Sequence, residues 1–215
     1  ASRLAQDAFA SVLSEIHEGV TESAIMDRIN AFTAQRGSER HPYYGWCASG
    51  PNTKHAIHRS GDRAVQEGDL VTMCVGSTLS GYCGSYGRAI AIGNVDPDVY
   101  RMVDDAIEIE EATTKAAKPG AVAHDVASSI NSMMTAKGYS PLYGPLHSTG
   151  LEECELPWVQ ENSQLVLQEN MTFNLDIWLE RDGNGVRIED GIVITKNGCD
   201  MFTSDFRSLN ICPVK

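Results

Sequence analysis

Three side chains in residues 67–93 could carry chemistry. Cys74, Ser85 and Arg88 alternate there with apolar residues, in a stretch that predicts a strand, a hairpin reversal and a returning strand. Polar residues on the inner face of such a hairpin can line a cavity. A cysteine thiolate can act as a nucleophile, and an arginine can bind a carboxylate through two parallel hydrogen bonds. We therefore expect this hairpin to form one wall of a functional cavity.

His147 is a second candidate for chemistry. The unperturbed pKa of histidine, about 6.5, suits proton transfer near neutral pH, and a carboxylate such as Asp176 or Glu189 would hold its tautomer. The residues that follow it, Ser-Thr-Gly, are small enough to admit a ligand. Two simpler interpretations remain open: a buried histidine with satisfied hydrogen bonds, and a solvated charge pair at Glu189 and Asp190.

Arginine and aromatic residues could complete such a cavity. Arg187, like Arg88, lies in a predicted strand and either supports the structure or binds a substrate carboxylate. Trp46 and Tyr82 could contact a small ligand, although aromatic residues of this kind also pack in cores. We retain Arg187, Trp46 and Tyr82 as candidate substrate-binding residues.

The predicted elements follow from the spacing of apolar residues. Helices are predicted over residues 2–17, 21–36, 98–117 and 123–136. Strands are predicted over 70–75, 88–92, 164–167, 171–179 and 186–195. Residues 38–64 are rich in Pro, Gly, Ser and Asn and predict a loop that could form a wall of the site.

The chain also repeats itself. Residues 18–37 match residues 119–138, and an offset of about 102 places Cys74 on Asp176. Because this period is close to half the chain, it predicts two halves related by a pseudo-twofold axis, approximately 1–97 and 98–215. Each half would contain a helix pair and a hairpin, and a pocket between the halves would collect residues from both hairpins.

Composition excludes several functions. The net charge of -12 and the lack of basic runs argue against binding to nucleic acid or to an anionic membrane surface. No apolar run approaches the roughly 18 residues that span a bilayer. The six cysteines form no CxxC pair, so we expect reduced thiols and a cytoplasmic location.

Several short motifs give the chain a family resemblance. They are Trp46-Cys47 followed by SGPNT, the Gly-Asp turn at 68–69, HSTGLEE at 147–153, MTFNLDI at 171–177 and GVRIEDGIVIT at 185–195. In this order they resemble the pita-bread family of creatinases, prolidases and methionine or Xaa-Pro aminopeptidases. The resemblance implies an α+β fold over residues 1–215 as one catalytic-type domain. Two-domain relatives carry another domain upstream, which we expect to be absent from this chain, and relatives commonly form homodimers, which we expect here.

The resemblance also implies a set of metal ligands. Peptidases of this family hold two divalent metals with five side chains, which fall here on Cys74, Ser85, His147, Asp176 and Glu189. Only His147 and Glu189 keep the family's residue type. Because two hard carboxylates are missing, the charge that a two-metal cluster needs is reduced. We therefore predict no metal cofactor.

Creatinase resembles this chain in having abandoned the metals. It uses a histidine from the loop after SGPN, which falls near His58 or, as a weaker candidate, His55. The glutamate that precedes its hairpin arginine is Gly87 here, which argues against creatine itself. We predict metal-independent hydrolysis of a C–N bond in a small amidine or amide. His58 or His147 would move the proton, and Asp176 with Glu189 would bind the cation. The alternatives are an Xaa-Pro peptidase with an altered metal site and a non-catalytic binding module.

Cys154 occupies the position of a second histidine in relatives. With Cys74 and His147 it could hold one soft ion such as zinc, completed by Asp176 or Glu189. One of the thiolates could instead act as a nucleophile beside His147. Packing alone would also explain both cysteines, so Cys74, Ser85 and Cys154 are expected to shape the substrate pocket.

Overall fold

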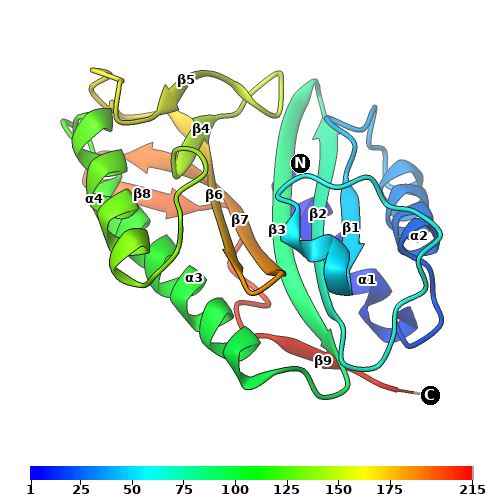
Figure 1. Cartoon of the computed structure of the whole chain (residues 1–215). Coiled ribbons are helices and arrows are strands. Elements are labelled where there is room, and N and C mark those ends of the chain that lie inside the picture. The colour runs from blue at the N-terminus through cyan, green and yellow to red at the C-terminus, as the bar shows by residue number, and fades with distance from the viewer. Residues whose placement is uncertain (215) are drawn as a thin grey trace.

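The computed structural model describes every residue of the chain except 215, and it shows four α-helices and nine strands among the described residues (Figure 1). The α-helices are α1 (Ser2–Val12), α2 (Glu22–Gln35), α3 (Pro97–Ala116) and α4 (Ala123–Ala136). The strands are β1 (Trp46–Ser49), β2 (Leu70–Leu79), β3 (Tyr82–Ile92), β4 (Leu146–Ser148), β5 (Glu155–Val159), β6 (Thr172–Arg181), β7 (Asn184–Thr195), β8 (Gly198–Met201) and β9 (Asn210–Cys212). Short 3₁₀ helices cover Leu13–Glu15 and Gly50–Lys54. The predicted α+β class is confirmed.

The sheet order places the two long hairpins side by side. The strands run β1-β2-β3-β7-β6-β4-β5, so the hairpins β2-β3 and β6-β7 meet at the centre of the sheet. Cys74 pairs with Gly87 in the first hairpin, and Asp176 pairs with Glu189 in the second. Gly87 in turn pairs with Glu189 where the hairpins join. The two hairpins therefore bring their central residues to one place.

The helices flank the sheet, and each pair packs on its own half. Helix α1 contacts β2 and β3, and helix α3 contacts β6 and β7 (Figure 1). The Thr21 hydroxyl accepts a hydrogen bond from Ala24 N at the start of α2, and Asp96 caps α3 in the same way. Two apolar clusters result, one around Phe9 and Ile25 and the other around Met102 and Ile130.

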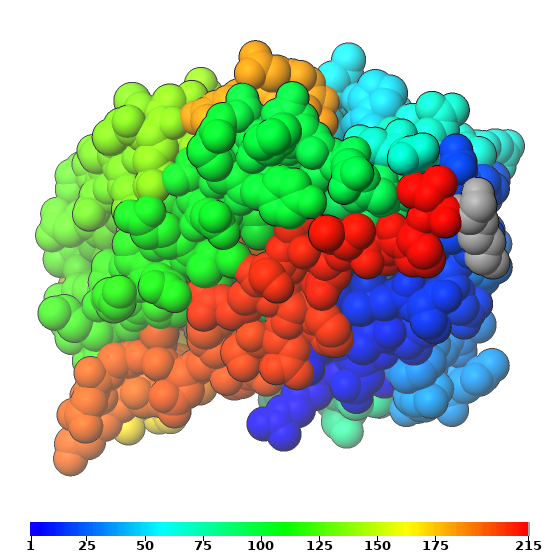
Figure 2. All heavy atoms as spheres, turned by 90° about the horizontal axis from the view of Figure 1, so that it is seen from below, coloured from blue at the N-terminus to red at the C-terminus, as the bar shows by residue number. Residues whose placement is uncertain are grey.

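The end of the chain returns to the first half. Strand β9 pairs in parallel with β3, joining Ile90–Ile92 to Asn210–Cys212. Figure 2 shows this segment, in red, lying across the molecule between α3 and the blue N-terminal residues. The C-terminal residues thus bind the two helix layers together.

Some predicted elements differ from the structure. Residues 164–167 form no strand, only an isolated bridge from Val166 to Val122. The first helix ends at Val12 and continues as a 3₁₀ turn to Glu15, short of the predicted residue 17. Five short strands, β1, β4, β5, β8 and β9, were not predicted, because runs of three to five residues depend on their neighbours in the sheet. No helix in the described part of the chain has the length and hydropathy needed to cross a membrane.

Candidate active site

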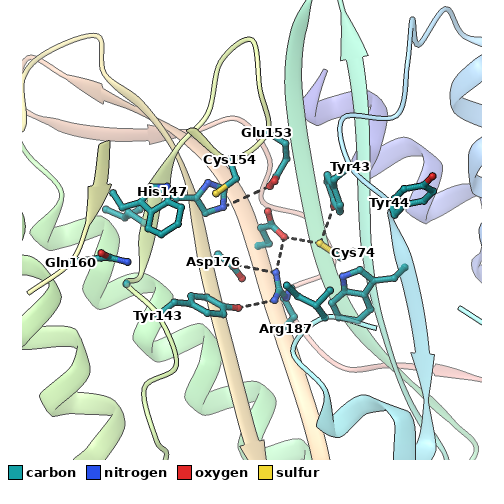
Figure 3. Close-up of a pocket in the computed structure, with 16 residues that line it drawn as sticks. Tyr43, Tyr44, Cys74, Tyr143, His147, Glu153, Cys154, Gln160, Asp176 and Arg187 are labelled. Carbon is teal, nitrogen blue, oxygen red and sulfur yellow. Dashed lines mark hydrogen bonds and ion pairs between the residues drawn. The ribbon is translucent and has the colours of Figure 1, made fainter. Parts of the chain in front are cut away.

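A cavity of about 420 Å³ opens between the two halves, beside the central strands (Figure 3). Its wall is drawn from β1, β2, β6, β7, the β4–β5 segment and the loops before β1 and β4. The lining residues are Tyr43, Tyr44, Trp46, Ile57, Cys74, Tyr143, Gly144, Leu146, His147, Glu153, Cys154, Trp158, Gln160, Asp176, Arg187 and Glu189. Seven of the sequence-predicted residues therefore share one cavity: Trp46, Cys74, His147, Cys154, Asp176, Arg187 and Glu189.

Arg187 organises the floor of this cavity. Its Nη1 donates to Asp176 Oδ2 at 2.9 Å and lies 3.6 Å from Glu189 Oε2. Its Nη2 donates to the Tyr143 hydroxyl at 2.7 Å and to the Ala56 carbonyl at 2.8 Å. Because the guanidinium is buried and already paired, it holds the two carboxylates in place.

Cys74 lies on the opposite side of Glu189. Its thiol donates to Glu189 Oε2 at 2.8 Å, and the Tyr43 hydroxyl lies 2.9 Å from its sulfur. Burial, together with the charge of Glu189, raises the pKa of the Cys74 thiol well above its usual range. Cys74 therefore stays protonated and serves as a hydrogen-bond donor, which does not favour a nucleophilic role.

Asp176 and Glu189 each keep one oxygen without a partner. Asp176 Oδ1 and Glu189 Oε1 are buried and have no hydrogen-bond partner among the described residues. Burial is the main cause that raises the pKa of Glu189, to about 8, and the negative charges of Asp176 and Glu153 add to it. Leaving a buried acceptor unpaired costs about 1–3 kcal/mol, so these oxygens mark a place for a ligand.

His147 lies on β4 and faces Glu153. Its Nε2 is 3.7 Å from Glu153 Oε1, and its Nδ1 donates to the Ser148 carbonyl at 3.2 Å. Burial lowers the pKa of His147, but a hydrogen bond with Cys154 and the surrounding carboxylates raise it to about 10. His147 thus has a fixed orientation, with Nε2 as the atom that faces the cavity.

Glu153 is the functional residue that sequence reasoning missed. Its Oε1 accepts hydrogen bonds from Ser85 Oγ at 3.0 Å and from Asn174 Nδ2 at 3.1 Å. Ser85 is fully buried and does not line the cavity; it acts through Glu153. The serine at position 85, where the resemblance implies an aspartate, was the sequence feature that could have indicated Glu153, because a small side chain there leaves room for another carboxylate. In the sequence, Glu153 is only the last residue of the HSTGLEE motif.

The structure does not bring His58, His55 or Tyr82 to this cavity. His58 Nε2 donates to the buried Glu22 at 3.0 Å, and the several hydrogen bonds that Glu22 accepts outweigh its burial and lower its pKa. His55 is exposed, and Tyr82 is 61% exposed at the tip of the first hairpin. His58 supports Glu22, since residues 50–61 fold back on α2.

Arg88 also points away from the cavity. It is fully buried and donates to both carboxylate oxygens of Asp190, at 3.0 and 2.8 Å. It also donates to the Glu189 carbonyl at 3.1 Å. In β7, therefore, Glu189 faces the cavity and Asp190 pairs with Arg88, a choice that alternation alone could not make.

The sequence of this chain is similar to those of known peptidases. The family described as metallopeptidase family M24 matches residues 1–196. An uncharacterized peptidase of Bacillus subtilis, YqhT, is 29% identical over 218 residues, which cover 98% of this chain and 61% of that protein. An Xaa-Pro dipeptidase of Pyrococcus horikoshii is 28% identical over 213 residues, covering 97% and 60%. The chain thus spans less than two thirds of the length of these curated relatives.

Solved structures agree with this fold. An X-Pro aminopeptidase from Thermotoga maritima superposes with a TM-score of 0.93 at 26% identity, over 98% of this chain and 60% of that one. An Xaa-Pro dipeptidase from Bacillus anthracis superposes with a TM-score of 0.93 at 27% identity, over the same shares. The expected pita-bread fold is confirmed. These findings support the peptidase alternative, and they give no support to the creatinase-like, metal-independent one.

The prediction of no metal cofactor is wrong, because the family that matches is a metallopeptidase family. The two-metal ligand set implied by the resemblance still does not fit these residues. Cys74 donates its hydrogen to Glu189, Ser85 donates to Glu153, and the Arg187 guanidinium already pairs with Asp176. Two hard divalent ions need more anionic oxygen ligands than this arrangement offers.

Proposed function

Because the chain belongs to metallopeptidase family M24, we propose that it is a hydrolase of the C–N bond in small peptides, of the Xaa-Pro class, with an altered metal centre. The observation that carries this proposal is the pair of buried, unpartnered oxygens, Asp176 Oδ1 and Glu189 Oε1, on residues that line a cavity of about 420 Å³. Small-ligand sites usually enclose roughly 300–1,000 Å³. The named relatives that are Xaa-Pro dipeptidases support the choice of substrate.

The cavity offers a distinct group to each part of such a substrate. Asp176 Oδ1 is free to accept hydrogen bonds from a substrate amino group. Trp46, Ile57 and Trp158 present apolar surface for a proline ring or an aliphatic side chain. Arg187 has no free terminal nitrogen, so its role is to hold Asp176 and Glu189 in position.

Glu189 is the residue placed to move a proton. Its Oε2 accepts from the Cys74 thiol, and its Oε1 is buried without a partner among the described residues, on a residue that lines the cavity. Because its pKa is raised to about 8, Glu189 is ionised above that pH, where it can take a proton from the attacking water and pass it to the leaving nitrogen, a role worth about 10²–10⁴ in rate. The two hairpins hold this atom rigidly, because Glu189 pairs with Gly87 on one side and with Asp176 on the other.

Space at Gly87 argues against the creatinase-like alternative. A Cβ atom at Gly87 would lie 2.8 Å from Glu189 Cβ and 3.1 Å from Arg187 Cγ. The glutamate that creatinase carries at this position would therefore not fit beside Glu189. A binding module without catalysis remains the competing class, and the buried carboxylates of Asp176 and Glu189 beside His147 in one cavity favour an enzyme over it.

Turnover of defined substrates tests the proposal. The purified full-length protein should be incubated with Xaa-Pro dipeptides, with dipeptides lacking proline and with guanidino acids, each with added divalent metals or with chelator. We expect release of the free amino acids from Xaa-Pro dipeptides, and a loss of about 10²–10⁴ in kcat for Glu189→Gln. The exposed Asp125→Asn should change nothing. Cleavage of guanidino acids alone, or binding of dipeptides without cleavage, would overturn the proposal.

Two expectations about the whole protein stay proposals. We propose a homodimer, by analogy with the family, and light scattering of the purified protein would test it. We also propose a cytoplasmic location; all six cysteines are free, which supports a reducing compartment. Cell fractionation would decide the second point.

A further inference from the structure

We propose that His147, Glu153 and Cys154 form a site for a single zinc-class divalent ion, in place of the family's pair. One ligand atom from each of these residues lies within 4.8 Å of the other two. Imidazole nitrogen, thiolate sulfur and carboxylate oxygen together are the donor types that zinc accepts. The proposal goes beyond the peptidase function, because ion binding can be measured without any substrate.

The local fold makes the three residues a compact group. His147 lies in β4, and Glu153 and Cys154 lie in the bend between β4 and β5. Figure 3 shows the Cys154 sulfur beside the His147 ring, with Glu153 directed toward the same ring. Cys154 is the exposed member, so an ion can enter from solvent. The cavity leaves a further coordination position open, as in catalytic zinc sites.

The groups behind these side chains already have the arrangement of an outer ligand shell. His147 Nδ1 donates to the Ser148 carbonyl, which leaves Nε2 as the coordinating atom. Ser85 and Asn174 both donate to Glu153 Oε1, the oxygen that lies 3.7 Å from His147 Nε2, and so hold this carboxylate in place beside the histidine. Such partners typically change metal affinity by about 10–100-fold when they are removed.

A second, independent observation also points to a ligand in this cavity. Asp176 Oδ1, Glu189 Oε1 and Asn174 Oδ1 are buried acceptors with no partner among the described residues. Asp176 and Glu189 line the same cavity as the three proposed ligands. Buried acceptors without partners indicate a polar or charged ligand, or ordered solvent, in this cavity.

The ligand set differs from the one suggested by sequence, in which Cys74 took part. Cys74 donates its hydrogen to Glu189 and contacts the Tyr43 hydroxyl, so it is not available as a thiolate. Glu153 replaces it, and Ser85 supports Glu153. The carboxylate that relatives place on the first hairpin is thus supplied from the β4–β5 bend.

Cobalt substitution tests the site, because a thiolate bound to Co²⁺ gives a charge-transfer absorption in the near ultraviolet. Metal-free protein should be titrated with Co²⁺ and with Zn²⁺, and the bound metal should be counted by mass spectrometry. We expect one ion per chain, together with the thiolate band. Cys154→Ser should abolish the band and weaken binding by at least about tenfold, and Ser85→Ala should weaken binding by about 10–100-fold.

Cys74→Ser is the matched control, because it removes a thiol from the same cavity and should leave the band unchanged. Circular dichroism would show that each variant is folded. Stoichiometric binding of two ions, absence of binding, or a band that persists in Cys154→Ser would each overturn the proposal. A protein that binds one ion with the thiolate band but cleaves no dipeptide would overturn only the peptidase function.

Discussion

The Ser85 hydroxyl donates a hydrogen bond of 3.0 Å to Glu153, across from the first hairpin to the β4–β5 bend. Position 85 is where the resemblance implies a metal-binding aspartate. The anionic oxygen at this side of the cavity therefore comes from Glu153, in a part of the chain 68 residues away. The hydrogen bond thus joins Ser85, which stands where the resemblance implies a metal ligand, to Glu153, which supplies a carboxylate on the same side of the cavity.

Restoring the family residue should be harmful. Ser85→Asp would place a second carboxylate against Glu153 at a fully buried position, where like charges and desolvation oppose folding. We expect the free energy of unfolding in urea to fall by at least about 2 kcal/mol. Adding Glu153→Gln should recover much of the loss. Equal stability of Ser85→Asp and the parent protein would contradict this account.

Arg187 should be the most costly single residue to remove from the site. Arg187→Met leaves Asp176 and Glu189 buried without their cation, which costs about 3–5 kcal/mol in comparable pairs. The exposed ion pair of Arg101 with Asp98 gives the control, and Arg101→Met should cost less than about 1 kcal/mol. Urea unfolding followed by circular dichroism measures both. A similar cost for the two variants would show that the buried pair has no special role.

Gly87 is required for the close approach of the two hairpins. Its added Cβ in Gly87→Ala would meet Glu189 Cβ at 2.8 Å, so β3 and β7 would have to separate. We expect a loss of about 1–3 kcal/mol in stability, as for overpacked cores, together with reduced kcat. Gly61→Ala is the control, because nothing lies within 4 Å of its Cβ position. An unchanged thermal midpoint for Gly87→Ala would argue against this tight packing.

Glu110 should make stability depend on pH. Burial, and then the neighbouring Asp190 carboxylate, outweigh the opposing charges of Arg88 and Arg207 and raise its pKa from 4.5 to about 8. The folded state therefore binds more protons than the unfolded state in this range, so the free energy of unfolding falls as pH rises from about 4.5 to about 8. Glu110→Gln should flatten this decline in thermal melts, whereas the exposed Glu169→Gln should leave it unchanged. Parallel profiles for Glu110→Gln and the parent would refute the assignment.

His58 should affect stability more than catalysis. It is hydrogen-bonded to the buried Glu22, outside the cavity, so His58→Ala leaves that carboxylate with one donor fewer. We expect a loss of about 1–3 kcal/mol in unfolding free energy and a kcat within about twofold of the parent. His147→Ala, compared in the same assays, removes a residue that lines the cavity and should lower kcat more than His58→Ala does. A large fall in kcat for His58→Ala, with stability retained, would restore the proton-transfer role predicted from the sequence.

Much of the fold could be predicted from the sequence, because its signals are local or repeated. Apolar spacing located the four helices to within a few residues, and the offset of about 102 related Cys74 to Asp176. Both residues do occupy equivalent positions in their hairpins. Short strands such as β4 and β5 were missed, because their pairing depends on partners far away in the chain.

By itself, the sequence determined the family, the two hairpins and the group Cys74, His147, Asp176 and Glu189 at the site. Tertiary structure decided how these side chains are used. Alternation along β7 allowed either Glu189 or Asp190 to face the cavity. In the structure Asp190 forms an ion pair with the buried Arg88, so Glu189 is the residue that faces the cavity. Glu153 belongs to the site because it contacts Ser85, which is distant in the chain, and His147, which lies on the other side of a bend. Such contacts have no local sequence signal, because they arise when the two halves close around one cavity.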